Sequence, residues 1–239
     1  PFLLPGILCN DSTIHIAAAA APEGDLEQAN PPSPSYDVKG DPTETCIISL
    51  AAQQHHDPTN IKRLQQQYVR LAEVPFDSAH KFMATLHCLP ARLLHPAPDL
   101  APTSPSLPAP SADPKVVLMK GSPERVLRFC VLAEAQQARW LRRAEELAGE
   151  GMRVLALAYR EMWEMQTEEI LVLPNLMDTC TQGGFTIHAL LGILDPPRAE
   201  AIVAVQQAQS AGITVKMITG DHPSTALAIA KQLGMKCSR

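Results

Sequence analysis

Runs of apolar residues, separated by polar and turn-forming residues, divide the chain into short elements, and the clearest succession covers 190–235. The apolar run 190–194 predicts a strand. The helical pattern that follows ends at Gly212, a residue able to take the positive φ of a helix end. A second apolar run, 213–218, predicts another strand, and a further helix begins at Pro223, where the missing N–H costs nothing. Strand, helix, strand and helix with short connections indicate half of an open, parallel α/β sheet.

Three residues, Thr219, Gly220 and Asp221, follow directly after the second of these predicted strands. In open parallel sheets, ligands bind beyond the carboxyl ends of the strands. A threonine hydroxyl and the free N–H groups at the start of the next helix can receive a phosphoryl group there. The pattern therefore indicates a candidate phosphoryl site in this loop.

Upstream of this region the same patterns predict several strands and helices. The predicted strands cover 69–76, 84–89, 115–120, 151–158 and 185–191. One helix covers 137–149, and another begins near Glu44 with an apolar face made by Cys46, Ile47, Leu50 and Ala51. We interpret 17–36 as a short helix end and an exposed loop, 178–181 as part of a loop, and the proline-rich stretch 90–114 as a tolerated insertion.

Composition narrows the class of protein. The chain has 239 residues, of which 46% are hydrophobic and 19% charged, as expected for a globular protein of one large or two ordinary domains. Its formal net charge of −5 argues against a general nucleic-acid partner. No apolar run approaches the roughly 20 residues that cross a bilayer. The six cysteines are scattered, so we expect neither a zinc site nor a disulfide framework; the start at Pro1 is what an excised fragment would show.

Four single residues can be interpreted either as functional or as ordinary structural residues. Glu44 lies in the first turn of its predicted helix, where a carboxylate favours the helix dipole. Phe76 ends a predicted strand, where a lone phenylalanine is usually part of the core. Lys120 and Arg153 lie at strand ends, where most such side chains are solvated. The residues alone leave both interpretations open.

A set of longer motifs, in order along the chain, resembles a known family. LCNDS, GDPTE, PFDSAHK, KGSPE and GMRVLALA precede DPPR and MITGD. Their wording, order and spacing are similar to type II P-type cation-transporting ATPases, the class of the calcium and sodium pumps. The resemblance implies that 1–194 form an α+β nucleotide-binding domain, with an antiparallel sheet flanked by helices. It implies that 195–239 belong to a partial α/β phosphorylation domain of the haloacid dehalogenase (Rossmann-type) class, joined through a hinge at Asp195, Pro196, Pro197 and Arg198.

The resemblance also assigns residues to an ATP site. By position in the motifs these are Glu44, Phe76, Lys81, Lys120, Gly121 and Arg153. Phe76 would stack on adenine, Glu44 would lie near the adenine amino group, and Arg153 would face the phosphates. One residue departs from the pattern: Ser78 stands where calcium pumps often have arginine, which removes a cation from the phosphate side.

The implied reaction is ATP-driven formation of an aspartyl-phosphate, coupled to cation movement across a membrane. ATP and Mg²⁺ would be its cofactors, and the phosphorylation, actuator and transmembrane domains of the same pump its partners, with this chain on the cytoplasmic side. The nucleophile motif D-K-T-G-T and the Mg²⁺-binding motif G-D-G-x-N-D are absent. We therefore expect ATP binding without turnover and no metal ligands of its own. The alternatives are a non-catalytic nucleotide-binding or scaffolding domain, or part of a haloacid-dehalogenase-type phosphatase.

Overall fold

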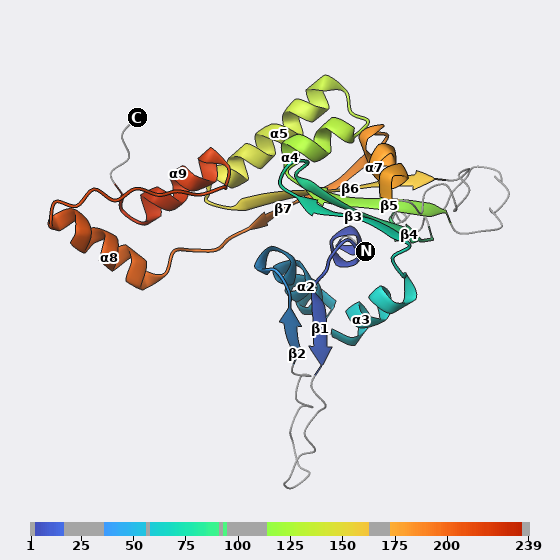
Figure 1. Cartoon of the computed structure of the whole chain (residues 1–239), viewed down its shortest axis with the longest axis horizontal. Helices are drawn as coiled ribbons and strands as arrows, with labels where there is room; N and C mark the ends of the chain where they lie inside the picture. Colours follow the sequence, from blue (N-terminus) through green and yellow to red (C-terminus); the bar gives the residue numbers. More distant parts are fainter. Residues whose placement is uncertain are drawn as a thin grey trace, which may run out of the picture.

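A five-stranded antiparallel sheet forms the centre of the molecule (Figure 1). The computed structural model describes residues 3–16, 36–55, 58–90, 93–94, 114–162 and 173–235. Strands lie side by side in chain order: β3 (Ala72–Asp77), β4 (Phe82–Cys88), β5 (Lys115–Gly121), β6 (Arg153–Met162) and β7 (Thr186–Ile193). Each predicted strand upstream of 190 is confirmed to within a few residues. The antiparallel sheet flanked by helices is the predicted α+β fold of the first domain.

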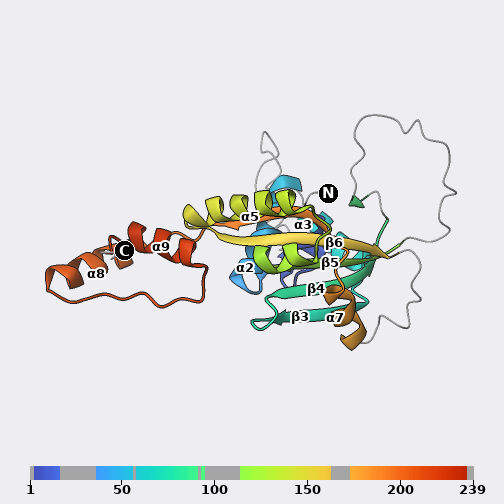
Figure 2. The same ribbon diagram turned by 90° about the horizontal axis from the view of Figure 1, so that it is seen from above.

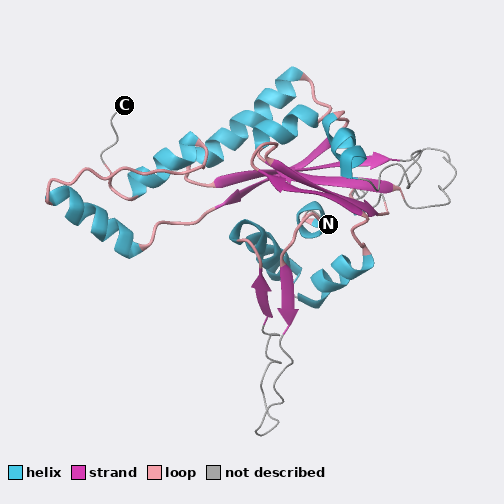
Figure 3. Ribbon diagram, viewed as in Figure 1, coloured by secondary structure: helices cyan, strands magenta, loops and turns pink. Residues whose placement is uncertain are grey.

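Helices cover both faces of this sheet (Figures 1 and 3). On one face lie α4 (Pro123–Val126), a 3₁₀ turn (Leu127–Phe129), α5 (Glu134–Gly149) and α7 (Leu173–Thr181). On the other face α1 (Leu4–Leu8) contacts β5 and β6, and α2 (Pro42–His55) and α3 (Pro58–Gln67) pack around α1. We call these the α5 face and the α2 face. A small antiparallel ribbon, β1 (Thr13–Ile16) with β2 (Tyr36–Lys39), lies beside α2 and α3.

The central strands are buried on both faces, which explains why they read as continuous apolar runs rather than as alternating patterns. On β5, Val117 and Met119 point into the core of the α5 face, whereas Val116 and Leu118 point into the core of the α2 face. Lys120 continues this second series and therefore points toward α2. The alternation of the strand thus places a charged side chain beneath the helix that carries Glu44.

Helix α2 begins at a capped turn. The Asp41 carboxylate accepts a hydrogen bond from the Thr43 N–H at 2.8 Å, which satisfies one of the free donors at the helix start. Ile47 and Ala51 are buried as predicted. Leu50 is 39% exposed, so its assignment to the apolar face was wrong; the buried stripe runs through Ile48 instead.

Residues 178–181 are part of helix α7, not of a loop as predicted. The buried residues of this segment are Leu176, Thr179 and Cys180, at positions i, i+3 and i+4. This is the spacing of one helix face. One of the three, Thr179, is polar and interrupts the apolar pattern of this helix face in the sequence.

The predicted parallel sheet near the C-terminal end does not form. Residues 190–193 belong to β7, which pairs antiparallel with β6, and no strand is assigned over 213–218. Ile218 is 97% exposed. An isolated extended segment needs a neighbouring strand to satisfy its backbone groups, and in the described part of the chain no strand pairs with 213–218. The haloacid-dehalogenase-like sheet is therefore not formed by these residues.

The two C-terminal helices are confirmed. Helix α8 (Ala199–Ser210) ends before Gly212, whose φ of +78° is the predicted left-handed conformation, and α9 (Pro223–Gln232) begins at Pro223. Helix α9 packs on α5, and the Thr225 hydroxyl donates to the Met152 carbonyl at 2.9 Å. Helix α8 has no buried residue, and Figure 2 shows it beyond the end of the sheet.

Two expectations fall mainly outside the described residues, namely the helix end and loop over 17–36 and the proline-rich stretch 90–114. Among the described residues, no helix combines the length and apolar character that a bilayer span requires. The domain boundary at 194/195 and the hinge at 195–198 stay predictions; 194–198 have no assigned helix or strand, and Arg198 precedes α8 as its N-cap residue.

Candidate nucleotide site

An ion pair between Glu44 and Lys120 lies between the first turn of α2 and the end of β5. The Lys120 ammonium contacts Glu44 Oε1, and the two side chains are only 7% and 14% exposed. The second carboxylate oxygen, Glu44 Oε2, accepts a hydrogen bond from the Asp11 N–H at 3.0 Å. Both predicted residues therefore meet in a nearly water-free position. The solvated interpretation of Lys120 is excluded.

Asn10, in the loop before β1, fixes the backbone around Glu44. The Asn10 amide, 4% exposed, donates to the Gly6 and Glu44 carbonyls, both at 3.1 Å, and its oxygen accepts the Ser12 N–H at 2.8 Å. A buried amide with all its contacts satisfied fixes backbone geometry. Asn10 thus ties α1 to the first turn of α2 and fixes where Glu44 points.

Arg153, the first residue of β6, bridges α2 and the C-terminal loop. Its guanidinium donates from Nη1 to the Thr43 hydroxyl at 3.1 Å, and from Nε and Nη2 to Asp221 Oδ1 at 3.1 and 2.5 Å. The Arg153 side chain is 53% exposed, so the guanidinium remains accessible to solvent. Burial acts to raise the pKa of Asp221, but hydrogen bonds from Arg153 and Thr219, with the charge of Arg153, lower it below its ordinary value.

Thr219, Gly220 and Asp221 lie in a loop before α9, not at the end of a strand. The Thr219 hydroxyl donates to Asp221 Oδ2 at 2.9 Å, and the Asp221 N–H donates back to the same hydroxyl at 3.1 Å. These contacts close the loop on itself. Thr219 is therefore engaged within the loop, while Asp221 joins the loop to Arg153.

Phe76 lies on the surface, not in the core, with 63% of its area exposed. Between the pairs Val74–Ala84 and Asp77–Phe82 the register of β3 shifts, so Pro75 and Phe76 together stand opposite Met83. Met83 pairs in turn with Lys120 on the next strand. The bulge therefore brings an exposed aromatic ring into the same row of the sheet as the buried lysine.

Gly121 and Lys81 meet where the β3–β4 turn approaches the end of β5. A Cβ on Gly121 would lie 2.5 Å from the Lys81 carbonyl oxygen, so only glycine fits at this approach. Lys81 itself has a φ of +58°. Its side chain lines a separate pocket with His80 and Arg125. No contact joins Lys81 to the Glu44–Lys120 pair among the described residues.

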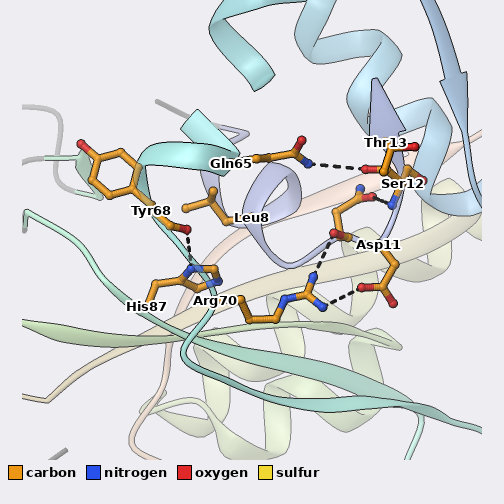
Figure 4. A pocket seen from close by; sticks show the side chains of 9 residues that line it. Leu8, Asp11, Ser12, Thr13, Gln65, Tyr68, Arg70 and His87 are labelled. Atoms are coloured by element: carbon orange, nitrogen blue, oxygen red, sulfur yellow. Dashed lines mark hydrogen bonds and ion pairs between the residues drawn. The ribbon is translucent and has the colours of Figure 1, made fainter. Parts of the chain in front are cut away.

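A second cavity, of about 270 Å³, adjoins the candidate site (Figure 4). Arg70 lies in its wall and donates to Asp11 Oδ1 at 2.7 Å and to the Asn10 carbonyl at 3.0 Å; it also pairs with Glu73. Through Asp11 this network touches Glu44. Sequence reasoning missed Arg70, because its partner Asp11 is 59 residues away and no local pattern signals the pairing.

His87 lines that cavity, and only 1% of its area is exposed. Its Nδ1–H donates to the Tyr68 carbonyl and its Nε2 accepts from the Thr85 hydroxyl, both at 3.0 Å, as Figure 4 shows for Tyr68. Burial, aided by the charge of Arg70, lowers the pKa of His87 to about 4, despite the opposing hydrogen bond to Tyr68. His87 is therefore neutral at pH 7.

The described residues offer no metal centre, and two of their buried thiols are held in the protonated form. No group of three or more His, Cys, Asp or Glu side chains is arranged to hold a metal ion within the described ranges. None of the described cysteines forms a disulfide. Burial raises the pKa of Cys130 and of Cys180 to about 12, so neither thiol ionises at neutral pH.

Known sequences resemble this chain over most of its length. The family model described as "P-type ATPase, cytoplasmic domain N" matches residues 2–200. Cation-transporting ATPase pma1 of Synechocystis is 33% identical, over 98% of this chain and 21% of that protein. The mouse calcium-transporting ATPase type 2C member 1 is 34% identical, over 83% of this chain and 18% of that protein. The rat sodium/potassium-transporting ATPase subunit alpha-4 is 30% identical, over 82% of this chain and 18% of that protein. The chain spans about a fifth of the length of these relatives.

Proposed function

The chain belongs to the family of P-type cation-transporting ATPases, and we propose that it binds ATP as the nucleotide-binding part of such an enzyme. The observation that carries this proposal is the buried Glu44–Lys120 pair, with the exposed ring of Phe76 in the same row of the sheet, two strands away. A buried ion pair adds little stability over apolar residues of the same volume, because both charges lose their hydration. Its place at the end of β5, in the same row of the sheet as the exposed ring of Phe76, favours a role in binding.

Each residue contributes a different contact in this proposal. The ring of Phe76 offers a flat apolar face to adenine, a contact worth about 1–3 kcal/mol per base. Glu44 accepts from the adenine amino group, and Lys120, released in part from Glu44, supplies positive charge. Arg153 approaches the phosphates with its planar guanidinium. Because Asp221 and Thr43 already occupy that guanidinium, a phosphate must share it or displace Asp221.

Ser78 and Lys81 are the reason why we expect ATP to bind weakly. With serine at 78, the β3–β4 turn lacks an arginine at this position, and Lys81 lines a neighbouring pocket. We therefore expect a dissociation constant for ATP in the high micromolar to millimolar range, which corresponds to roughly −4 to −6 kcal/mol.

For the intact protein we propose ATP-driven cation transport through an aspartyl-phosphate, with this chain on the cytoplasmic side of the membrane. Residues 195–239 would belong to the haloacid-dehalogenase-like phosphorylation domain, joined through the hinge at 195–198. Strands from the remainder of the pump would then flank 213–218 and complete the sheet. Mg²⁺ would arrive with ATP and be held by other parts of the enzyme, since the described residues form no group of three or more His, Cys, Asp or Glu side chains that could hold a metal ion.

Calorimetric titration with ATP tests the nucleotide site. Lys120→Gln removes the charge and should weaken ATP binding at least about tenfold, whereas Lys62→Gln, an exposed change of the same type on α3, should leave it unchanged. The double variant Glu44→Gln/Lys120→Gln removes both charges and avoids an unpaired buried carboxylate, so it separates lost binding from lost stability. If either Lys120 variant, folded by circular dichroism, binds ATP as tightly as the original chain, the proposed site is wrong.

A further inference from the structure

Arg70 is a half-buried cation that the proposed ATP site does not use directly. It lies two residues before β3, and its side chain is 26% exposed. Its Nη1 donates to Asp11 Oδ1 at 2.7 Å, as Figure 4 shows, and also pairs with Glu73. Its Nη2 donates to the Asn10 carbonyl at 3.0 Å. One guanidinium therefore joins the start of β3 to the loop before β1.

The Asn10–Asp11 peptide links Arg70 to Glu44. Its carbonyl accepts from Arg70 Nη2, and its N–H, which is that of Asp11, donates to Glu44 Oε2 at 3.0 Å. Because a peptide unit is planar and trans, its carbonyl and N–H point in opposite directions, so fixing the first fixes the second. A hydrogen bond from a cation to the carbonyl also polarises the peptide and strengthens the N–H as a donor. Arg70 therefore determines how this donor meets the Glu44 carboxylate.

Both the charge and the shape of Arg70 matter for this contact. Burial acts to lower the pKa of Arg70, but hydrogen bonds and charges from Asp11 and Glu73 raise it above its ordinary value, so the guanidinium stays charged. Its planar fork directs N–H groups to the Asp11 carboxylate and to the Asn10 carbonyl at the same time. A lysine ammonium is a compact point charge and offers no such fork.

The Glu44 side chain is held at both carboxylate oxygens. Oε1 contacts the Lys120 ammonium, and Oε2 accepts the Asp11 N–H. A carboxylate has about four lone-pair sites, so it can accept from a further donor. The Asn10 amide donates to the Glu44 carbonyl at 3.1 Å, which fixes the backbone of Glu44 from the same loop. The direction in which Glu44 can accept another hydrogen bond is thereby set by the loop that Arg70 holds.

We propose that Arg70 is a positioning residue for base recognition, which orients Glu44 through the Asn10–Asp11 peptide toward an amino group of the base. The inference rests on the proposed function, in which Glu44 accepts from the adenine amino group. Hypoxanthine carries an oxygen in place of this amino group, and a carboxylate repels it. A site built around a hydrogen bond rejects a base that cannot form it, which requires the acceptor to be held in place. Arg70 supplies that constraint without contacting the base.

NMR titrations of the full chain with ATP and with inosine triphosphate (ITP) test this role. We expect the original chain to bind ATP at least about tenfold more tightly than ITP. Arg70→Gln should reduce this preference to about threefold or less, by weakening ATP and leaving ITP nearly unchanged. Arg63→Gln, the same change at an exposed arginine on α3, should preserve the preference. An unchanged preference in Arg70→Gln, or an equal loss of affinity for both nucleotides, overturns the proposal.

Two further variants show whether Arg70 acts through Glu44. Arg70→Lys keeps the charge beside Asp11 and serves if Arg70→Gln unfolds; without the planar fork, the ATP preference should still fall at least about threefold. In the Glu44→Gln/Lys120→Gln background, Arg70→Gln should change the preference no further, because residues that act as one unit are not additive. A full preference in Arg70→Lys, or a further loss in that background, would show that Arg70 does not position Glu44.

The Asp11 amide signal of the unliganded chain separates this inference from the proposed function. It should shift in Arg70→Gln and in Glu44→Gln, which remove the two partners of this peptide, and stay in place in Arg63→Gln. An Asp11 signal that ignores Arg70→Gln refutes the positioning role even if ATP binds. If the signal responds but the original chain binds no ATP, the proposed function is wrong, and the role of Arg70 in base recognition fails with it.

Discussion

Phe76 is a large apolar side chain that the fold leaves 63% exposed, at a bulge in an edge strand. Phe76→Ala should weaken ATP and ADP by the same factor, about 5- to 150-fold, because stacking involves the base and not the γ-phosphate. The melting temperature should hardly change, since little buried area is lost. Val131→Ala, at an exposed valine away from the site, is the control for calorimetric titration. Unequal effects on ATP and ADP would argue against stacking.

His87 makes folding stability depend on pH. Its pKa is about 4 in the folded protein against 6.5 for an ordinary histidine. Between these values the unfolded chain binds a proton that the folded chain excludes, so stability should fall as pH drops from about 6.5 to about 4, by on the order of 3 kcal/mol in total.

Urea unfolding at pH 7 and pH 5 measures this effect. His87→Asn keeps an N–H donor near the Nδ1 position, for the Tyr68 carbonyl, but cannot titrate. The variant should therefore lose less stability than the original chain on acidification. Equal losses in both proteins would place the pH dependence at other groups.

Sequence reasoning identified some residues of the site and missed others for a physical reason. Glu44, Lys120 and Arg153 were found because each lies at an element boundary inside a recognisable motif. Arg70 belongs to the same network but contacts Asp11 across 59 residues, and such pairings leave no local pattern. Lys81 was assigned to the ATP site, and its side chain lines a separate pocket with His80 and Arg125.

At the scale of elements, Gly121 lies where the β3–β4 turn, the end of β5 and the start of α4 come together. Gly121→Ala should destabilise the protein by about 1–3 kcal/mol, because its Cβ would lie 2.5 and 2.8 Å from the Lys81 oxygen and the Phe82 Cα, both backbone atoms. Gly149→Ala is a matched control in α5, where a Cβ meets nothing within 4 Å and alanine favours the helix. Chemical denaturation should show loss for the first and no loss, or a gain, for the second. If Gly121→Ala leaves the free energy of unfolding unchanged, the close approach of Gly121 to the Lys81 backbone is wrong.

Elements were predictable where the local pattern and the tertiary structure demand the same conformation. Strands β5 and β6 are apolar along their length because both faces are covered, and they were found from that run alone. The segment 213–218 is equally apolar, yet it forms no strand, because pairing depends on a neighbour and not on the segment itself. Helix α7 was missed for a different reason, since a polar residue, Thr179, forms part of its buried face.

At the scale of the whole molecule, Arg153 and Asp221 join the sheet to the C-terminal segment, and Asp221 is the single carboxylate of the 219–221 loop. Its oxygens are held by Arg153 and Thr219, and phosphoryl transfer needs an in-line nucleophile that the chain's motifs do not supply. With Mg²⁺ and cations added, we expect no acid-stable phosphoenzyme and no ATP hydrolysis above background. Hydrolysis that persists through purification and is abolished by Asp221→Asn would favour the phosphatase alternative.

The most direct test of the central claim is an ATP titration of the isotopically labelled chain, followed by heteronuclear NMR. The account predicts saturable shifts that concentrate at the first turn of α2, at Phe76 and around Lys120 and Arg153. Adenosine should reproduce the shifts at Phe76 and the first turn of α2, but not those at Arg153. No saturable shift up to millimolar ATP, or shifts confined to residues remote from Glu44 and Lys120, would contradict the account.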